Sequence, residues 1–236
     1  MILVLASEHD WPALALVRRW KDYGARLLTC RDLSTPGWRY YPGDPAVSRA
    51  MVGGRSFPFE EIGGVLVRLA SVTEDELPHI VAADRAYVAA EMTAFLVAWL
   101  SETHFPVVNR PTPVCLLGPN WHQEQWLHAA AQAGVRLRSK PCPQQPSEAI
   151  SSDTDAGRLC TVTVVGERCF GEADESLKEL SRRIARAAGV TLLSAQFSRP
   201  NAGTEFVGAY LGADISRPPV ADALLDCFRP CAVAAR

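Results

Sequence analysis

Short apolar runs alternate with helical patterns in the first part of the chain, and this alternation constrains the fold more than any other feature. Residues 2–6 (ILVLA) form a continuous apolar run, which is typical of a strand buried on both faces of a parallel sheet. A helical pattern follows, with Asp10 as its predicted N-cap and Gly24 as its stop. Residues 26–30 then have the composition of a second strand. The chain is therefore predicted to begin with a β-α-β unit.

The same alternation continues along the chain. Further strands are predicted over residues 62–69, 105–108, 160–166, 192–197 and 205–211. Helices are predicted over residues 74–100 with a break near Pro78, and over 121–133, 175–188 and 219–228. Residues 34–56 are rich in glycine, proline and aromatic residues and predict a loop that has a hairpin signal at Gly53-Gly54. The fold class is therefore α/β: an N-terminal open, mostly parallel sheet with flanking helices, followed by a shortened α+β part.

Charge and hydropathy exclude several classes of partner. The chain has 236 residues and a formal net charge of −2, so we expect no nucleic acid partner. No run approaches the roughly 20 apolar residues of a membrane helix, so we expect no membrane partner. The seven cysteines show neither CxxC nor zinc-type spacing, and no metal site is predicted. The N-terminal apolar run lacks a basic flank and indicates a strand rather than a signal peptide, which predicts a cytoplasmic protein.

Several segments together resemble the ATP-grasp ligases, and in particular their ribosomal-protein-modifying and microviridin-type peptide ligases. The segments are IGGVLVRL (62–69), DRAYVAAEMTAFLVAWL (84–100), PVVNRPTP (106–113), AAAQAGV (129–135), VTVVGERCFG (162–171) and ADALL (221–225). The resemblance implies an N-terminal domain (1–117), a connecting helix (118–138) and a truncated ATP-grasp-like part (159–236). Between the last two, a proline- and serine-rich composition predicts a linker or mobile loop (139–158).

The groups that an ATP-grasp enzyme needs are missing at the positions that the resemblance assigns to them. Such an enzyme uses lysines on the phosphates of ATP and acidic or amide side chains on magnesium. The resemblance places the family's arginine at Thr161, its metal-binding acid at Gln196, and its final Glu-x-Asn at Gly208 and Tyr210. The lysine expected after NRPT is absent, and only three of the 24 basic residues are lysines, with Lys140 the only one in the linker. The resemblance therefore implies a truncated relative that uses no cofactor.

The carboxyl ends of the predicted parallel strands are the expected place for a ligand. Ser7, Glu8 and His9 follow the first strand and are predicted to bind a peptide. His9 and Glu8 are also candidates for acid/base catalysis, because histidine beside a carboxylate is a common acid/base pair. The alternative is that Ser7 or Asp10 only caps the following helix and His9 is solvated.

Three further residues lie at the ends of later strands. Arg68 ends the strand over 62–69 and could bind a peptide carboxylate, or could pair with Glu91 or Asp84. Asn109 and Arg110 follow the strand over 105–108 and are predicted to contribute to the same peptide-binding edge.

Aromatic residues complete the predicted peptide-binding set. Tyr87 lies four residues before Glu91 on one helix face, which borders either the cleft or a solvated, salt-bridged surface. Trp38, with Tyr40 and Tyr41, lies in the Gly/Pro loop, and Trp121 lies at a helix start. These tryptophans either form an exposed aromatic surface for a peptide or pack into the core.

The resemblance implies a peptide-binding protein that does not use ATP. It would bind a ribosomal precursor peptide and guide its cyclisation, including pyrroloindoline formation, in natural-product pathways such as crocagin biosynthesis. One alternative is an ATP-independent peptide cyclase that uses acid/base groups of the cleft. Another is a regulatory or scaffold subunit of an intact ligase. A homodimer and contacts with other pathway enzymes are also expected.

Overall fold

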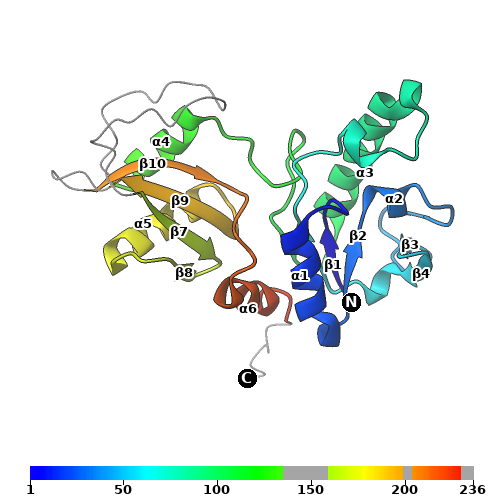
Figure 1. The fold of residues 1–236 in the computed structure, drawn as a ribbon, viewed down its shortest axis with the longest axis horizontal. Coiled ribbons are helices and arrows are strands. Elements are labelled where there is room, and N and C mark those ends of the chain that lie inside the picture. Colours follow the sequence, from blue (N-terminus) through cyan, green and yellow to red (C-terminus); the bar gives the residue numbers. More distant parts are fainter. Residues whose placement is uncertain (135–158, 199–203, 230–236) are drawn as a thin grey trace. The chain divides into compact units, whose positions relative to one another are not determined.

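The structure is a computed structural model that describes residues 1–134, 159–198 and 204–229 (Figure 1). The chain forms two compact units: Met1–Asn120 together with the segment from Asp214 onward, and Trp121–Ala213. The predicted linker over 139–158 lies outside the described residues. The predicted mixed α/β class is confirmed, because the first unit contains a parallel sheet and the second an antiparallel sheet.

The first unit is built on four parallel strands. They are β1 (Ile2–Leu5), β2 (Ala25–Leu28), β5 (Gly64–Val67) and β6 (Val107–Val108), in the order β2-β1-β5-β6. Every residue of β1 and β5 is buried, as expected of strands covered on both faces.

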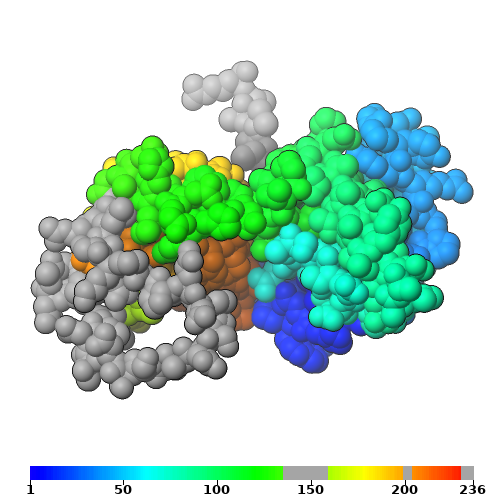
Figure 2. Space-filling model, turned by 90° about the horizontal axis from the view of Figure 1, so that it is seen from above, coloured from blue at the N-terminus to red at the C-terminus, as the bar shows by residue number. Residues whose placement is uncertain are grey.

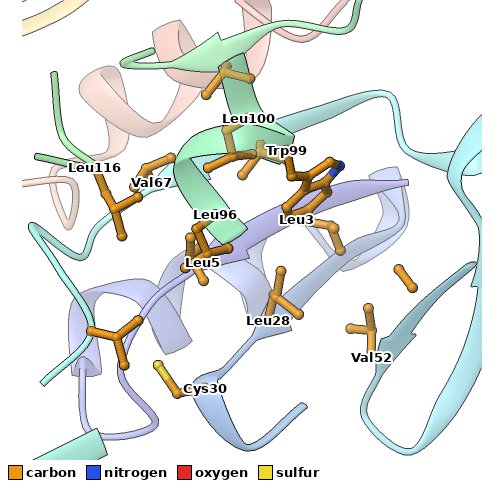
Figure 3. Packing of buried hydrophobic residues seen from close by; sticks show 14 of the residues in the cluster. Leu3, Leu5, Leu28, Cys30, Val52, Val67, Leu96, Trp99, Leu100 and Leu116 are labelled. Atoms are coloured by element: carbon orange, nitrogen blue, oxygen red, sulfur yellow. The ribbon is translucent and has the colours of Figure 1, made fainter. Parts of the chain in front are cut away.

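Helices pack against this sheet. They are α1 (Trp11–Arg19), α2 (Cys30–Leu33), α3 (Arg85–Glu102) and α6 (Pro218–Asp226). Figure 3 shows the core where side chains of α3, including Leu96, Trp99 and Leu100, lie over Leu3 and Leu5 of β1. Each leucine that is fully buried here contributes roughly 1.5–3 kcal/mol to folding.

Helix α6 belongs to the first unit although it comes last in the chain. The ring of Phe228, just after α6, packs edge-on against Trp20, with 6.1 Å between ring centroids. Arg19 donates hydrogen bonds to both carboxylate oxygens of Asp222. The segment from Asp214 onward therefore lies in the first compact unit, with α6 packed beside α1. The expected division into 1–117, 118–138, 139–158 and 159–236 stays a prediction.

Two local differences from the sequence prediction have simple causes. The second strand ends at Leu28 because Thr29 and Asp32 form a capping box that starts α2, which was not predicted. The predicted helix before Pro78 is only the 3-10 turn η3 (Glu74–Glu76), and a second 3-10 turn, η4 (Ala82–Asp84), precedes α3. Two more 3-10 turns are η1 (Lys21–Tyr23) and η2 (Phe59–Glu61).

The hairpin signal at Gly53-Gly54 is confirmed. These glycines connect β3 (Arg49–Val52) to β4 (Arg55–Pro58), which pair antiparallel. Their φ values are 56° and 74°, and a two-residue turn with positive φ at both positions matches the twist of a hairpin.

The second unit is a four-stranded antiparallel sheet with two helices. Its elements are α4 (Gln123–Gln132), β7 (Cys160–Val165), β8 (Arg168–Phe170), α5 (Glu175–Ala187), β9 (Leu192–Ser198) and β10 (Glu205–Tyr210), and its strand order is β10-β9-β7-β8. Strand pairing places apolar residues such as Val164, Leu193 and Phe206 on one face of the sheet. The opposite face carries Thr161, Gln196 and other polar residues. Within the described ranges, no helix has the length and apolar character needed to cross a membrane.

Candidate functional site

The residues after β1 form an open turn rather than an enclosed acid/base pair. The Ser7 hydroxyl oxygen accepts a hydrogen bond from the backbone N–H of His9 at 3.2 Å. The His9 side chain is 84% exposed, and its Nε2 lies 3.8 Å from a carboxylate oxygen of Glu8. This geometry matches the solvated alternative for His9, and it gives Glu8 and His9 no shielded site in which to exchange protons with a substrate.

Arg68 is held by a carboxylate from the neighbouring strand end. Its Nε donates to Oδ2 of Asp10 at 2.9 Å, and both side chains are more than four-fifths buried. Oδ1 of the same carboxylate accepts from the backbone N–H of Ala13 at 3.0 Å and so caps α1. Asp10 thus replaces the expected partners Glu91 and Asp84, because β1 and β5 are adjacent and end at the same edge.

The pKa of a second carboxylate, Asp214, is also affected by the charge of Arg68. Hydrogen bonds from Ser216 hold the pKa of Asp214 below its usual range, and the charges of Arg217 and Arg68 act in the same direction. At the carboxyl edge of the sheet, Arg68 thus forms an ion pair with Asp10 and contributes to the low pKa of Asp214.

Asn109 and Arg110 follow β6, and Arg110 has a structural role. Asn109 is only 3% exposed. The guanidinium of Arg110 donates to the carbonyl oxygens of Leu100, Ser101 and Thr103. These carbonyls lie at the end of α3, where backbone acceptors lack partners within the helix, so Arg110 stabilises this helix end.

His79, which no sequence motif singled out, lies beside the same edge. Its Nε2 is 2.8 Å from the Ser34 hydroxyl, and Nδ1 is buried without a hydrogen-bond partner among the described residues. The adjoining cavity, which is lined in part by Glu8 and Cys30, has a volume of only about 10 Å³. Such a cavity holds at most one water molecule and excludes a substrate. The sequence feature that points to His79 is the predicted helix break near Pro78, because it places His79 in the loop after β5.

The stability of the fold is expected to fall in mild acid because of His79. Burial, together with the charges of Arg31 and Arg85, lowers the pKa of His79 against the opposing effect of Glu8. The unfolded chain therefore binds a proton at the ordinary histidine pKa that the folded chain does not bind, and stability declines as the pH falls below about 6.5.

Urea unfolding at about pH 7.5 and about pH 5.5 measures this effect. The His79→Asn variant is expected to lose less stability between the two values than the wild type does. His9→Asn, which changes an exposed imidazole, serves as the control and should keep the wild-type dependence. An unchanged pH dependence in His79→Asn would contradict the assignment.

The aromatic residues predicted to bind a peptide lie in three different places. Trp38 donates from Nε1 to the carbonyl of Asp32 at 2.9 Å, and its ring packs edge-on against Trp99 at 5.7 Å. The half-buried Trp38 therefore packs against the core, which was one of its two predicted roles. Trp121 lies in the second unit against Trp126, with ring centroids 4.8 Å apart. Tyr87, by contrast, is 69% exposed on α3.

An open groove runs along α3. It has a volume of about 780 Å³ and is lined by one face of the helix, by residues 71–74 and by Pro113. Its floor includes Ala86, Ala90, Ala94 and Ala98, which repeat every fourth residue and are all exposed. Tyr87 lies two helical turns before Ala94, on the same side of the helix, and so borders the groove. Figure 2 shows the surface of this helix in teal, on the face seen from above.

Helix α3 is unusually apolar for a helix with an open face. Apolar residues occur around its whole circumference, and Leu96, Trp99 and Leu100 on its inner side are fully buried. A helix with this pattern is normally covered on all sides. The groove is therefore a surface suited to a further apolar segment.

In the second unit, three positions that the resemblance singled out lie in one row. Thr161 of β7 is directly opposite Gln196 of β9, and Gln196 is directly opposite Gly208 of β10. Tyr210 lies opposite Ser194 on the same face. The row thus presents a hydroxyl, an amide and a bare backbone position, and no carboxylate.

The first residue of α4 lies at the end of this row. The side-chain amide of Gln123 donates to the carbonyl oxygen of Val207. A Cβ at Gly208 would lie 3.0 Å from Oε1 of Gln123. The close approach favours glycine at position 208, since a larger side chain would displace Gln123.

Comparison with solved structures decides the fold. No protein-family model matches the sequence, and no curated protein matches it significantly. The macrocyclase MdnC from Microcystis aeruginosa, bound with precursor peptide MdnA, superimposes with a TM-score of 0.70 at 12% identity, covering 97% of this chain and 99% of that one. The chain has the ATP-grasp ligase fold.

Two further ATP-grasp ligases agree with this assignment. PsnB, complexed with minimal precursor, gives a TM-score of 0.67 at 12% identity and covers 96% of this chain and 98% of its own. The RiPP-associated ligase of Chryseobacterium gregarium, in complex with ADP and a leader and core peptide, gives 0.66 at 10% identity and covers 95% and 96%. The predicted resemblance to ATP-grasp ligases of peptide pathways is thus confirmed at the level of the fold.

Three of the positions that the resemblance assigns to ATP and magnesium carry uncharged residues in the described part of this fold. Magnesium prefers carboxylate and phosphate oxygens as ligands. Thr161, Gln196 and Gly208 supply no carboxylate oxygen. In the part of the chain that the structure describes, no three His, Cys, Asp or Glu residues are grouped so that they could hold a metal ion.

Proposed function

We propose that this chain binds a ribosomally made precursor peptide and guides its maturation without using ATP. The observation that carries the proposal is the neutral row of Thr161, Gln196 and Gly208 in an ATP-grasp fold. The similar structures support the peptide half of the proposal, because MdnC, PsnB and the Chryseobacterium ligase each hold a precursor or leader peptide. The uncharged residues at these three positions support the second part of the proposal, that the chain does not use ATP.

The groove on α3 is the proposed peptide site. From Ala86 to Ala98 the helix rises about 18 Å, which matches three turns of a helical peptide or five to six extended residues. A symmetric dimer formed through this face would place the groove of one copy against the groove of the other. Two hollows do not fill one another, so a convex peptide segment is the better occupant.

Charge at one end of the groove indicates what the peptide should carry. The groove continues into a second hollow of about 590 Å³, which shares Thr73 and Glu74 with it and also contains Asp75. Arg85 also lines this hollow and donates to the carbonyls of Ile80 and Pro78, and its single positive charge is outnumbered by the two carboxylates. The proposed peptide therefore has an apolar face and a basic residue near one end.

Calorimetry with two ligands tests the proposal. A synthetic precursor peptide encoded beside this chain's gene is expected to bind with micromolar affinity, and a scrambled peptide of the same composition serves as the control. Millimolar ATP with magnesium is expected to produce no binding heat. Micromolar ATP binding would refute the ATP-independent part, and equal affinity for the scrambled peptide would refute specific recognition.

We further propose a homodimer, contacts with other pathway enzymes, a cytoplasmic location, and cyclisation of the peptide to a pyrroloindoline. Sedimentation tests the dimer, and mass spectrometry of a peptide incubated with the chain tests the cyclisation. The exposed His9 and Glu8 give the alternative of an acid/base cyclase no support.

A further inference from the structure

A second cavity lies against the last turn of α3, on the side of the helix opposite the groove. It has a volume of about 370 Å³, within the usual range for ligand sites. Its walls come from α3, the turn η2 and the segment after Trp38, all in the first unit. The proposed peptide groove shares no lining residue with it.

Aromatic rings form the inner wall of this cavity. Phe59 is 5% exposed and Trp99 is fully buried. Tyr40 stacks on Phe59 with ring centroids 5.8 Å apart and an interplanar angle of 23°, and Phe105 packs edge-on against Trp99. Because Phe59 and Trp99 are shielded from solvent, the rings that a bound group can reach are those of Tyr40 and of Tyr41, which is 52% exposed.

The rim of the cavity carries negative charge. Asp44, Glu60 and Glu102 line it together with His104, and neither lysine nor arginine is among its lining residues. The hydroxyl of Tyr40 donates to a carboxylate oxygen of Glu102 at 2.6 Å. Burial, together with this contact, raises the pKa of Tyr40 to about 12, so the phenol stays neutral and adds no competing charge.

We propose that this cavity binds the side chain of an arginine residue in a peptide or protein. Aromatic faces beside carboxylates attract a cation, and the planar guanidinium can stack on a ring while it donates to Glu60 or Glu102. The proposal goes beyond the proposed function, because the cavity and its ligand are separate from the groove.

Nuclear magnetic resonance titration tests this proposal with small probes. N-acetyl-arginine methylamide is expected to shift the assigned indole N–H signal of Trp99 in a saturable way. N-acetyl-citrulline methylamide, which has nearly the same shape and no charge, should bind about fivefold or more weakly. Equal binding of both probes, stronger binding of N-acetyl-tryptophan methylamide, or no saturation by the arginine probe would overturn the proposal.

Two neighbouring glutamates provide matched variants. Glu60 lines the cavity, whereas Glu61 does not, and both are exposed. Glu60→Gln is expected to weaken binding of the arginine probe about threefold or more, while Glu61→Gln leaves it unchanged. An equal loss in both variants would mean that only the general charge of the surface matters. These measurements use no precursor peptide, so their result is independent of the peptide calorimetry.

Discussion

Replacing Ala94 with arginine is expected to weaken binding of the precursor peptide about 100-fold, a loss of about 2.7 kcal/mol. Ala94 is exposed in the floor of the α3 groove, and the long side chain would occupy the volume that the peptide needs. The added positive charge would also repel the basic residue expected in the peptide. Because arginine is a good helix former and the position is exposed, the fold should be kept. Calorimetry with the variant measures the loss.

Ser101→Arg is the matched control for this prediction. Ser101 is exposed on the same helix and lines neither the groove nor the second cavity, so the control adds the same charge elsewhere. It should bind the peptide as the wild type does. Unchanged affinity in Ala94→Arg would exclude the groove as the peptide site. A change from dimer to monomer in Ala94→Arg, measured by sedimentation, would instead identify the groove as a dimer interface.

Replacing Gly64 with alanine is expected to lower the free energy of unfolding by about 2–3 kcal/mol. A Cβ at this position in β5 would lie 2.3 Å from a ring carbon of Phe228. Phe228 is itself held against Trp20 and is 7% exposed, so its ring has little room to move. The expected consequence is weakened packing of the chain end after α6. Denaturant unfolding measures the change.

A neighbouring glycine and a double variant separate this clash from general effects of alanine. A Cβ at Gly63 would meet only the carbonyl of Met1 at 3.7 Å, which is an ordinary contact, so Gly63→Ala should change stability by less than about 0.5 kcal/mol. In a Phe228→Ala background, Gly64→Ala should cost much less than in the wild type, since the clashing ring is gone. Additive losses in the double variant would contradict the proposed contact.

The regular part of the fold could be predicted because its signals are local. The apolar runs at β1 and β5 and the stop at Gly24 depend only on periodicity and backbone preference. The glycine pair at the β3–β4 turn carries its own conformational requirement. Helix α2 was missed although its capping box is local, because Thr29 and Cys30 also continue the apolar run of β2.

The site was harder to predict because it depends on which surfaces stay uncovered. The sequence placed Arg68 at the correct edge but could not reveal that Asp10 would bind it across two adjacent strands. The alanines of α3 look like core residues in the sequence, and only the structure shows that they are exposed. Trp38 illustrates the converse, since its Gly/Pro loop suggested exposure while its ring packs among other aromatic residues.

The position of α6 affects the order in which the chain can mature on the ribosome. The first unit is interrupted after Asn120 and resumes only at Asp214, so its last helix is synthesised after the whole second unit. At typical elongation rates, the intervening stretch of about 90 residues delays α6 by roughly 5–20 s. During that interval the surface around Trp20 and Gly64 that Phe228 later covers is exposed to water. Chaperones that recognise apolar surface therefore have a defined period in which to bind the nascent first unit.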